Sequence, residues 1–158
     1  MIKSDAGLKG EVRIIVRRSD GSVEEHSFRN VITDAGKTWL LKLGFTDETA
    51  RFRYIAIGTG TTPESSSDTA LENEIVRVNA GVEFVTIDTN NDAVRLHGVF
   101  DSSVVSGLQS ITEAGVFNDA SGGVLLARRV FPVINVDFDA GDVLEIFWTI
   151  QLKYLGEE

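Results

Sequence analysis

The stretch VLEIFWTIQLKY, residues 143–154, decides the fold class of this chain. From Leu144 to Leu152 every second side chain is apolar, and Trp148 lies in the middle of that series. Apolar side chains at a period of two belong on one face of a β-strand, whereas a helix would repeat them every three to four residues. We therefore predict a strand over residues 143–154 with one face in the hydrophobic core.

Strand signals also occur upstream, separated by short segments rich in turn residues. Asp20-Gly21 and Asn90-Asn91-Asp92 favour tight turns, because these residues tolerate positive φ or bond to nearby backbone. The predicted strands cover residues 11–18, 23–28, 52–57, 82–88, 93–100, 111–118, 124–131 and 143–154. About eight short strands at close spacing are typical of an antiparallel, jelly-roll-like β-sandwich. We predict an all-β fold that forms one domain over residues 1–158.

One short helix is predicted near residues 34–43, because residues 37–43 contain neither Pro nor Gly. Thr33 or Asp34 can cap its start, and Gly44 stands where a C-terminal cap is expected. Three apolar side chains fall on a single helical stripe and are expected to pack in the core against the sheet: Trp39, Leu40 and Leu43.

The composition excludes several classes of protein. The chain has 158 residues and no cysteine, which excludes disulfides, thiolate metal sites and a cysteine nucleophile. Its formal net charge of −9 opposes nucleic-acid binding, which requires Lys and Arg to neutralise phosphates. The longest apolar run, residues 143–152, is interrupted by Glu145 and is too short to span a bilayer, and the N-terminus lacks the apolar core of a secretory signal. We expect a soluble protein that binds neither nucleic acid nor membrane.

No motif in the sequence favours an enzyme or a cofactor. Gly58-Thr59-Gly60 is not followed by the Gly-Lys-Ser/Thr of a phosphate-binding loop, and no Gly-x-Ser-x-Gly elbow occurs. His26 and His97 are too few to make a zinc site in a chain without cysteine. We therefore predict a protein without catalytic residues or cofactor.

Three carboxylates, Asp137, Asp139 and Asp142, precede the last predicted strand and are weak metal candidates. Calcium prefers such oxygen-rich loops, but the EF-hand spacing and its distal glutamate are missing. Two interpretations stay open, an ion site and an acidic turn.

Glu113 is a charged residue inside the apolar strand predicted at residues 111–118. An unpaired buried carboxylate is costly, so Glu113 needs a partner, for which Arg77 is a candidate. Arg128 and Arg129 are adjacent in another predicted strand and so point to opposite faces of the sheet. One of the two can pair with an acid or lie at an interface, the alternative being solvent-exposed surface.

Several motifs occur in a fixed order: NVITDAGK at residues 30–37, YIAIGTGTTP at 54–63, SDTALENE at 67–74, ITEAGVFN at 111–118 and WTI at 148–150. Together they resemble a group of small tail and virion structural proteins of tailed bacteriophages. The resemblance covers most of the chain from Asn30 to Leu152. The motif residues to which we assign a structural role, that of maintaining the fold, are Gly58, Gly60, Arg77, Glu113 and Gly115.

The resemblance implies a non-enzymatic structural component of the phage particle, assembled in the host cytoplasm and located in the virion. Its partners would be the major capsid protein or proteins of the tail and baseplate. Capsid decoration (cement) protein and short tail fibre or baseplate component both stay open. A compact β-sandwich that forms a small homo-oligomer, such as a trimer, suits either position.

Subunit interfaces need apolar and aromatic anchors on the outside of the fold. Ile15, Phe147 and Tyr154 are the interface candidates, because the strand pattern points them away from the core. The alternative function is a carbohydrate-binding adhesin, a receptor-binding tail protein. That function would require Trp39 or Trp148 to be exposed for stacking, whereas the pattern predicts both to be buried.

Overall fold

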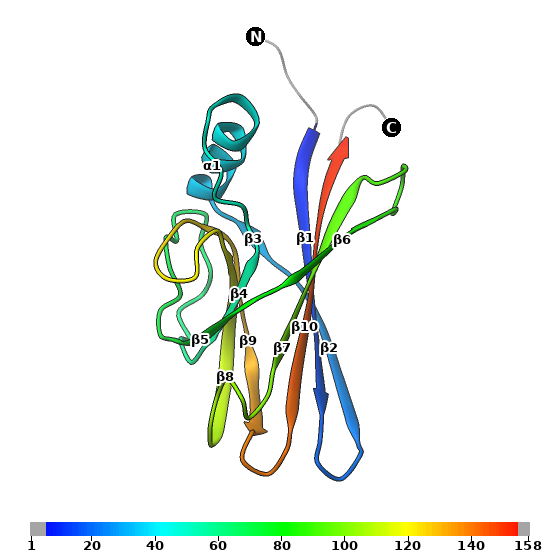
Figure 1. Ribbon diagram of the computed structural model, residues 1–158, viewed down its shortest axis with the longest axis vertical. Helices are drawn as coiled ribbons and strands as arrows, with labels where there is room; N and C mark the ends of the chain where they lie inside the picture. Colours follow the sequence, from blue (N-terminus) through cyan, green and yellow to red (C-terminus); the bar gives the residue numbers. More distant parts are fainter. Residues whose placement is uncertain (1–5, 155–158) are drawn as a thin grey trace.

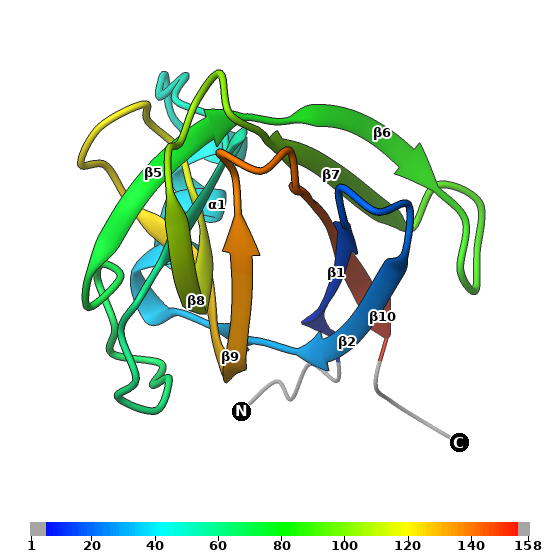
Figure 2. The same cartoon turned by 90° about the horizontal axis from the view of Figure 1, so that it is seen from below.

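Two antiparallel five-stranded sheets pack face to face in the computed structural model, which describes residues 6–154 and the side chains of residues 7–153 (Figures 1 and 2). The first sheet has the order β2-β1-β10-β7-β6, with β1 (Ala6–Arg17), β2 (Val23–Arg29), β6 (Gly81–Val85), β7 (Ala93–Phe100) and β10 (Val143–Tyr154). The second has the order β3-β9-β8-β4-β5, with β3 (Val31–Ile32), β4 (Tyr54–Gly58), β5 (Glu74–Asn79), β8 (Leu108–Phe117) and β9 (Leu125–Asp137). The predicted all-β sandwich is confirmed.

The strand that decides the fold class lies at the centre of the first sheet. β10 pairs with β1 along its whole length and with β7 on its other side. Trp148 faces the core opposite Val12, is fully buried, and donates its indole N–H to Oδ1 of Asn30 at 2.9 Å. The predicted strand and the buried position of Trp148 are therefore both confirmed.

Two strands were not predicted, and several predicted limits were wrong, since β1 begins at Ala6 instead of residue 11, β8 at Leu108 instead of residue 111, and β6 ends at Val85 instead of residue 88. β3 has only two residues, and β5 is an edge strand of mixed polarity, so neither carries a clear period of two. β9 continues past Pro132 to Asp137, although Pro normally ends a strand. Pro132 is tolerated because the β8–β9 register shifts there, between the pairs Glu113–Val130 and Ile111–Ile134, where no ladder N–H is required.

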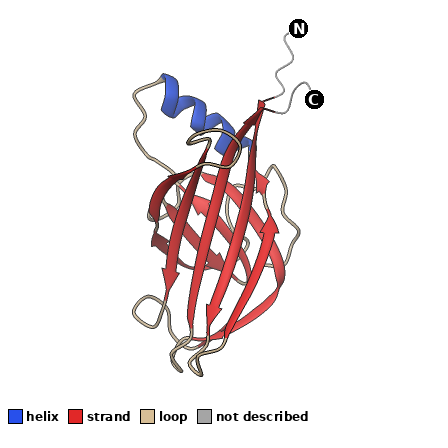
Figure 3. Ribbon diagram, turned by 90° about the vertical axis from the view of Figure 1, so that its right-hand side faces the viewer, coloured by secondary structure: helices blue, strands red, loops and turns tan. Residues whose placement is uncertain are grey.

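Helix α1 (Asp34–Phe45) lies at one end of the sandwich and packs on β9 (Figure 3). Thr33 caps its start by accepting a hydrogen bond from the Gly36 backbone N–H at 2.9 Å, as predicted. The predicted cap at Gly44 is wrong, since the helix continues through it and Thr46 takes the C-cap position. No helix among residues 6–154 is long and apolar enough to cross a membrane.

The expectation that Trp39 packs in the core is also wrong. Trp39 is half-buried and donates its indole N–H to the Ala50 carbonyl at 2.7 Å, so it fixes the segment that follows the helix. Leu40 packs against the core instead. The helical stripe identified which residues share a side of α1, but the next loop, and not the sheet, covers Trp39.

Candidate interaction surface

A loop of residues 59–73, between β4 and β5, is fastened to the fold by one buried carboxylate; we call this loop the strap. Glu113 on β8 is fully buried. Its Oε1 accepts hydrogen bonds from the backbone N–H groups of Gly60 at 3.0 Å and Asn73 at 2.7 Å, and its Oε2 accepts from Glu72 at 3.0 Å. One carboxylate thus holds both ends of the strap.

The charge of Glu113 is balanced by Arg128, and the predicted partner Arg77 is wrong. Arg128 Nη2 lies 2.9 Å from Glu113 Oε2, while Nη1 donates to Asp68 at 3.0 Å and Nη2 also donates to the Thr62 carbonyl at 3.0 Å. Burial alone lowers the pKa of Arg128, but the bonds to Asp68 and Glu113 outweigh it and raise the pKa. Arg128 and Glu113 lie on neighbouring strands, since β8 pairs with β9 and places Arg128 opposite Gly115, two residues from Glu113.

Arg77 has a separate structural role. It forms an ion pair with Glu74 at 2.6 Å, and its guanidinium lies 3.7 Å from the centre of the Phe117 ring. It also donates to the carbonyls of Asp119 and Gly122, which fixes the β8–β9 loop. The sequence did carry a signal for the correct partner, since Arg128, like Glu113, is a charge inside an apolar strand.

The motif glycines are required by the close approach of the strap to the sheet. A Cβ atom on Gly60 would lie 2.6 Å from Glu113 Oε1, and one on Gly58 would lie 2.5 Å from the same oxygen. A Cβ atom on Gly115 would lie 2.8 Å from the Leu71 side chain of the strap. These three positions therefore serve the architecture.

The three aspartates before β10 bind backbone N–H groups. Asp142 accepts from Ser19 at 2.9 Å and from Asp137 at 3.0 Å, and these bonds outweigh the effect of burial and lower its pKa. Asp137 accepts from Ala140, and Asp139 accepts from Gly107, the residue just before β8. Within residues 6–154 no group of three His, Cys, Asp or Glu side chains is arranged to hold a metal ion. The arrangement fits the acidic-turn interpretation.

The outer face of the first sheet contains the predicted interface candidates. Ile15 is only 6% exposed, so its expected outward exposure is wrong. Two ion pairs run diagonally across its neighbours on the sheet, Arg13–Glu25 at 2.5 Å and Arg17–Glu145 at 2.7 Å, and they leave little of Ile15 accessible.

Phe147 is half-buried on the same face, but its own neighbours cover its ring. His97 stacks on it with the ring centres 4.3 Å apart, and the guanidinium groups of Arg13 and Arg95 lie 5.8 and 5.9 Å from its centre. Tyr154 ends β10, and its side chain lies outside the described residues. The outer face is therefore a charged, internally paired surface.

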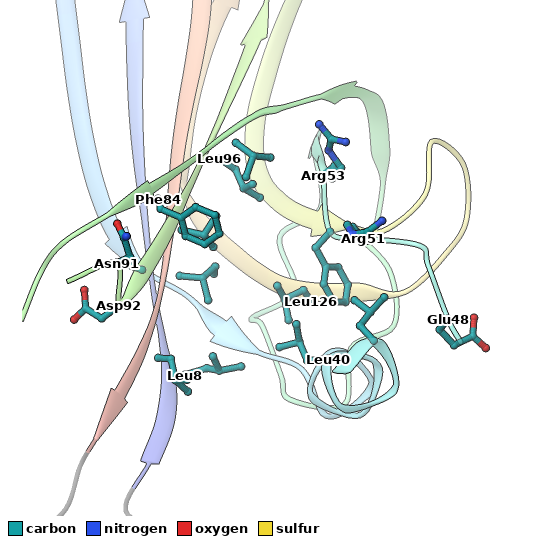
Figure 4. A pocket seen from close by; sticks show the side chains of 17 residues that line it. Leu8, Leu40, Glu48, Arg51, Arg53, Phe84, Asn91, Asp92, Leu96 and Leu126 are labelled. Atoms are coloured by element: carbon teal, nitrogen blue, oxygen red, sulfur yellow. The ribbon is translucent and has the colours of Figure 1, made fainter. Parts of the chain in front are cut away.

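A groove of about 640 Å³ opens between α1 and the inner face of the first sheet; we call it the end groove (Figure 4). It was not predicted, because alternation indicates which side chains face inward but not how far the opposite sheet extends. Its rim holds Glu48, Arg51, Arg53, Asn91 and Asp92. Its apolar lining consists of Leu8, Val82, Phe84, Ala93, Val94, Leu96, Ile150 and Leu152 from the first sheet, and of Leu40, Leu43, Phe52 and Leu126 from the opposite side.

The end groove exists because the first sheet extends beyond the second. Figure 1 shows β1 and β10 continuing towards the level of α1, past the strands of the second sheet. The helix covers this part of the first sheet only partly, and Phe84 and Leu152 stay 71% and 64% exposed. Both side chains point to the core side of the sheet, so an apolar inner face is left open.

Comparison with known proteins gives no match to a family model, to a curated protein or to a solved structure.

Proposed function

We propose that this chain is a non-enzymatic structural protein of a tailed bacteriophage particle that binds neighbouring virion subunits. The observation that carries the proposal is the end groove, an apolar sheet face that no element among residues 6–154 fully covers. Large apolar patches on soluble proteins commonly mark sites of protein association. The groove offers deep aromatic and aliphatic anchors with a charged rim, which is the usual composition of a protein interface.

The structural roles of the charged motif residues agree with a role in binding. Glu113, Arg128 and Arg77 are committed to bonds that hold the strap and the β8–β9 loop. The aspartates before β10 are bonded to backbone N–H groups. These groups maintain the fold, which leaves the apolar surface to interact with other molecules.

The virion location rests on the motifs that resemble phage structural proteins. In the fold, the motifs at residues 54–63 and 67–74 meet the distant motif at residues 111–118 through Glu113. Residues that meet in this way form one architectural unit, which supports treating the resemblance as one of fold. The protein would act in the virion after assembly in the host cytoplasm, as a capsid decoration protein or as part of a tail fibre or baseplate.

The adhesin alternative has less support. Trp148 is fully buried, and the indole N–H of the half-buried Trp39 is already bonded to Ala50. Neither tryptophan offers the open aromatic platform with a free N–H on which a sugar ring would stack.

Co-sedimentation with purified phage components tests the proposal. We expect the wild-type chain to pellet with expanded, emptied capsids or with tails, and Phe84→Glu to lose that binding, because the charge would enter the end groove. Val23→Glu is the matched control, since Val23 is 55% exposed on β2 and does not line the groove. A wild-type chain that binds neither capsids nor tails would contradict the proposal.

A further inference from the structure

Helix α1 is apolar on two sides, and the sandwich covers only one of them. Leu40 and Leu43 line the end groove. Leu41 and Phe45 are 63% and 85% exposed, and at 100° per residue they lie nearly opposite the first pair. A surface helix normally has a polar face towards solvent, and a helix apolar on both sides is typical of one buried on both sides.

The exposed side of α1 is followed by two acids. Asp47 and Glu48 are exposed, come directly after the helix, and form no ion pair with any described residue. We call Leu41, Phe45 and these two acids the α1 knob. It is an apolar projection that ends in two acids, with Lys37 and Lys42 beside it on the same exposed side of the helix.

The rim of the end groove holds two cations, Arg51 and Arg53, beside the acids Glu48 and Asp92. Arg51 and Arg53 are both exposed and form no ion pair within residues 7–153. The one hydrogen bond of the Arg51 side chain goes to the Thr49 carbonyl at 3.3 Å. An apolar groove bordered by two free cations is notable in a chain with a net charge of −9. The apolar lining suits the apolar side chains of the α1 knob, and the two arginines can pair with its two acids.

We infer that the end groove receives the α1 knob of a second copy of this chain. Leu41 and Phe45 of one copy pack on the lining of the other, and Asp47 and Glu48 pair with Arg51 and Arg53. The inference rests on the proposed role of the groove in protein binding and names its occupant.

The geometry supports reciprocal exchange between two copies. Knob and groove lie on opposite sides of α1 and adjoin along the loop of residues 46–53, since Glu48 also lies at the rim of its own groove. Because the knob and the groove complement each other, a two-fold axis lets each copy place its knob in the groove of the other. A different partner in the groove would leave Leu41 and Phe45 uncovered, whereas a second copy covers both surfaces.

Charge reversal provides a test that a merely damaged fold cannot mimic. Asp47→Lys/Glu48→Lys makes both the knob and the rim basic, and Arg51→Glu/Arg53→Glu makes both acidic. Each double variant alone should be monomeric by sedimentation velocity at low salt. An equimolar mixture of the two should form dimers again, and the chain with all four changes should dimerise alone.

A neutral variant tests the apolar half of the contact. Phe45→Ser removes a side chain that is 85% exposed and should leave the fold intact by circular dichroism. It should weaken dimerisation about 30-fold or more, as the loss of a central aromatic anchor does.

The outcomes separate this inference from the proposed function. A monomeric wild-type chain that still binds capsids or tails would overturn the inference and leave the function standing, because the groove would then hold a virion partner. A dimer that both charge variants leave unchanged, or a trimer, would overturn the two-fold exchange. A dimer restored only in the mixture and in the fourfold variant would support it, whether or not phage particles bind.

Discussion

At the scale of single residues, the pair of Glu113 and Arg128 connects the sheet to the strap. The Glu113 carboxylate receives three backbone N–H groups as well as the guanidinium of Arg128. Buried ion pairs of this kind are costly to form but are strongly destabilising when one partner is removed. The strap therefore depends on one side chain in β8.

Glu113→Gln tests that dependence. The substitution keeps the size of the side chain but leaves Arg128 without its fully buried counter-charge and turns an amide N–H₂ towards backbone donors. We expect the free energy of unfolding in urea to fall by about 3–5 kcal/mol.

Glu25→Gln is the matched control, because it breaks the exposed pair with Arg13. That change should cost less than about 1 kcal/mol. Equal losses in the two variants would show that the strap is not fastened through Glu113.

The carboxylate of Asp92 holds the β6–β7 hairpin and makes the stability of the fold depend on pH. Its carboxylate accepts from the backbone N–H groups of Ile87, Asp88 and Thr89 and from Gln151, which lowers its pKa far below the ordinary 3.8. A lowered folded-state pKa stabilises the fold above the unfolded value, and this contribution is lost as the pH falls towards the folded value. Thermal melts of the wild type should therefore drop between about pH 5 and pH 2.

Asp92→Asn has no such proton linkage at this position. Its melting temperature should be lower than that of the wild type at neutral pH and should decline less steeply with acid. Parallel curves for the two proteins would contradict the assigned role of Asp92.

At the scale of elements, the two glycines of α1 have opposite effects on the stability of the fold. A Cβ atom on Gly36 would lie 2.7 Å from the Leu126 backbone of β9, whereas one on Gly44 would meet nothing within 4 Å. Gly36 lets the helix approach the sheet. Gly44 only weakens the last turn.

Alanine at these two positions should therefore act in opposite directions. Gly44→Ala should raise the free energy of unfolding by about 0.5–1 kcal/mol, through helix propensity alone. Gly36→Ala should lower it by about 1–3 kcal/mol, because backbone of β9 must move. Denaturant unfolding of both variants gives the comparison, and the same sign for both would mean that α1 does not pack on β9 through Gly36.

Strands could be predicted where the polarity of the side chains alternates along the chain. They could not be predicted where only pairing with a neighbouring strand holds the segment extended. β7 and β10 have the predicted limits, because each alternates over a long stretch. β5 has no such alternation and is held at a sheet edge by its pairing with β4. Of the site residues, the need of Glu113 for a partner could be predicted, but Arg128 could not be chosen over Arg77 without knowing that β8 pairs with β9.

At the scale of the whole molecule, the unequal length of the two sheets determines the surface. The first sheet extends beyond the second, and α1 fills only part of the resulting gap. No local pattern predicts this gap, since the alternation along each strand indicates only that the apolar side chains of the groove face inward. The end groove is a property of how the sheets are stacked.

The absence of cysteine from the chain allows the central claim, that the end groove is the binding surface, to be measured directly. A single thiol at Leu152→Cys reports on the groove, and one at Val23→Cys reports on an equally accessible control site, since these residues are 64% and 55% exposed. The labelling rate of each thiol is measured for the free monomer and for the assembled or particle-bound protein. We predict that assembly slows labelling at Leu152→Cys strongly and leaves Val23→Cys unchanged. Equal labelling rates at Leu152→Cys in the free and bound states would contradict the account.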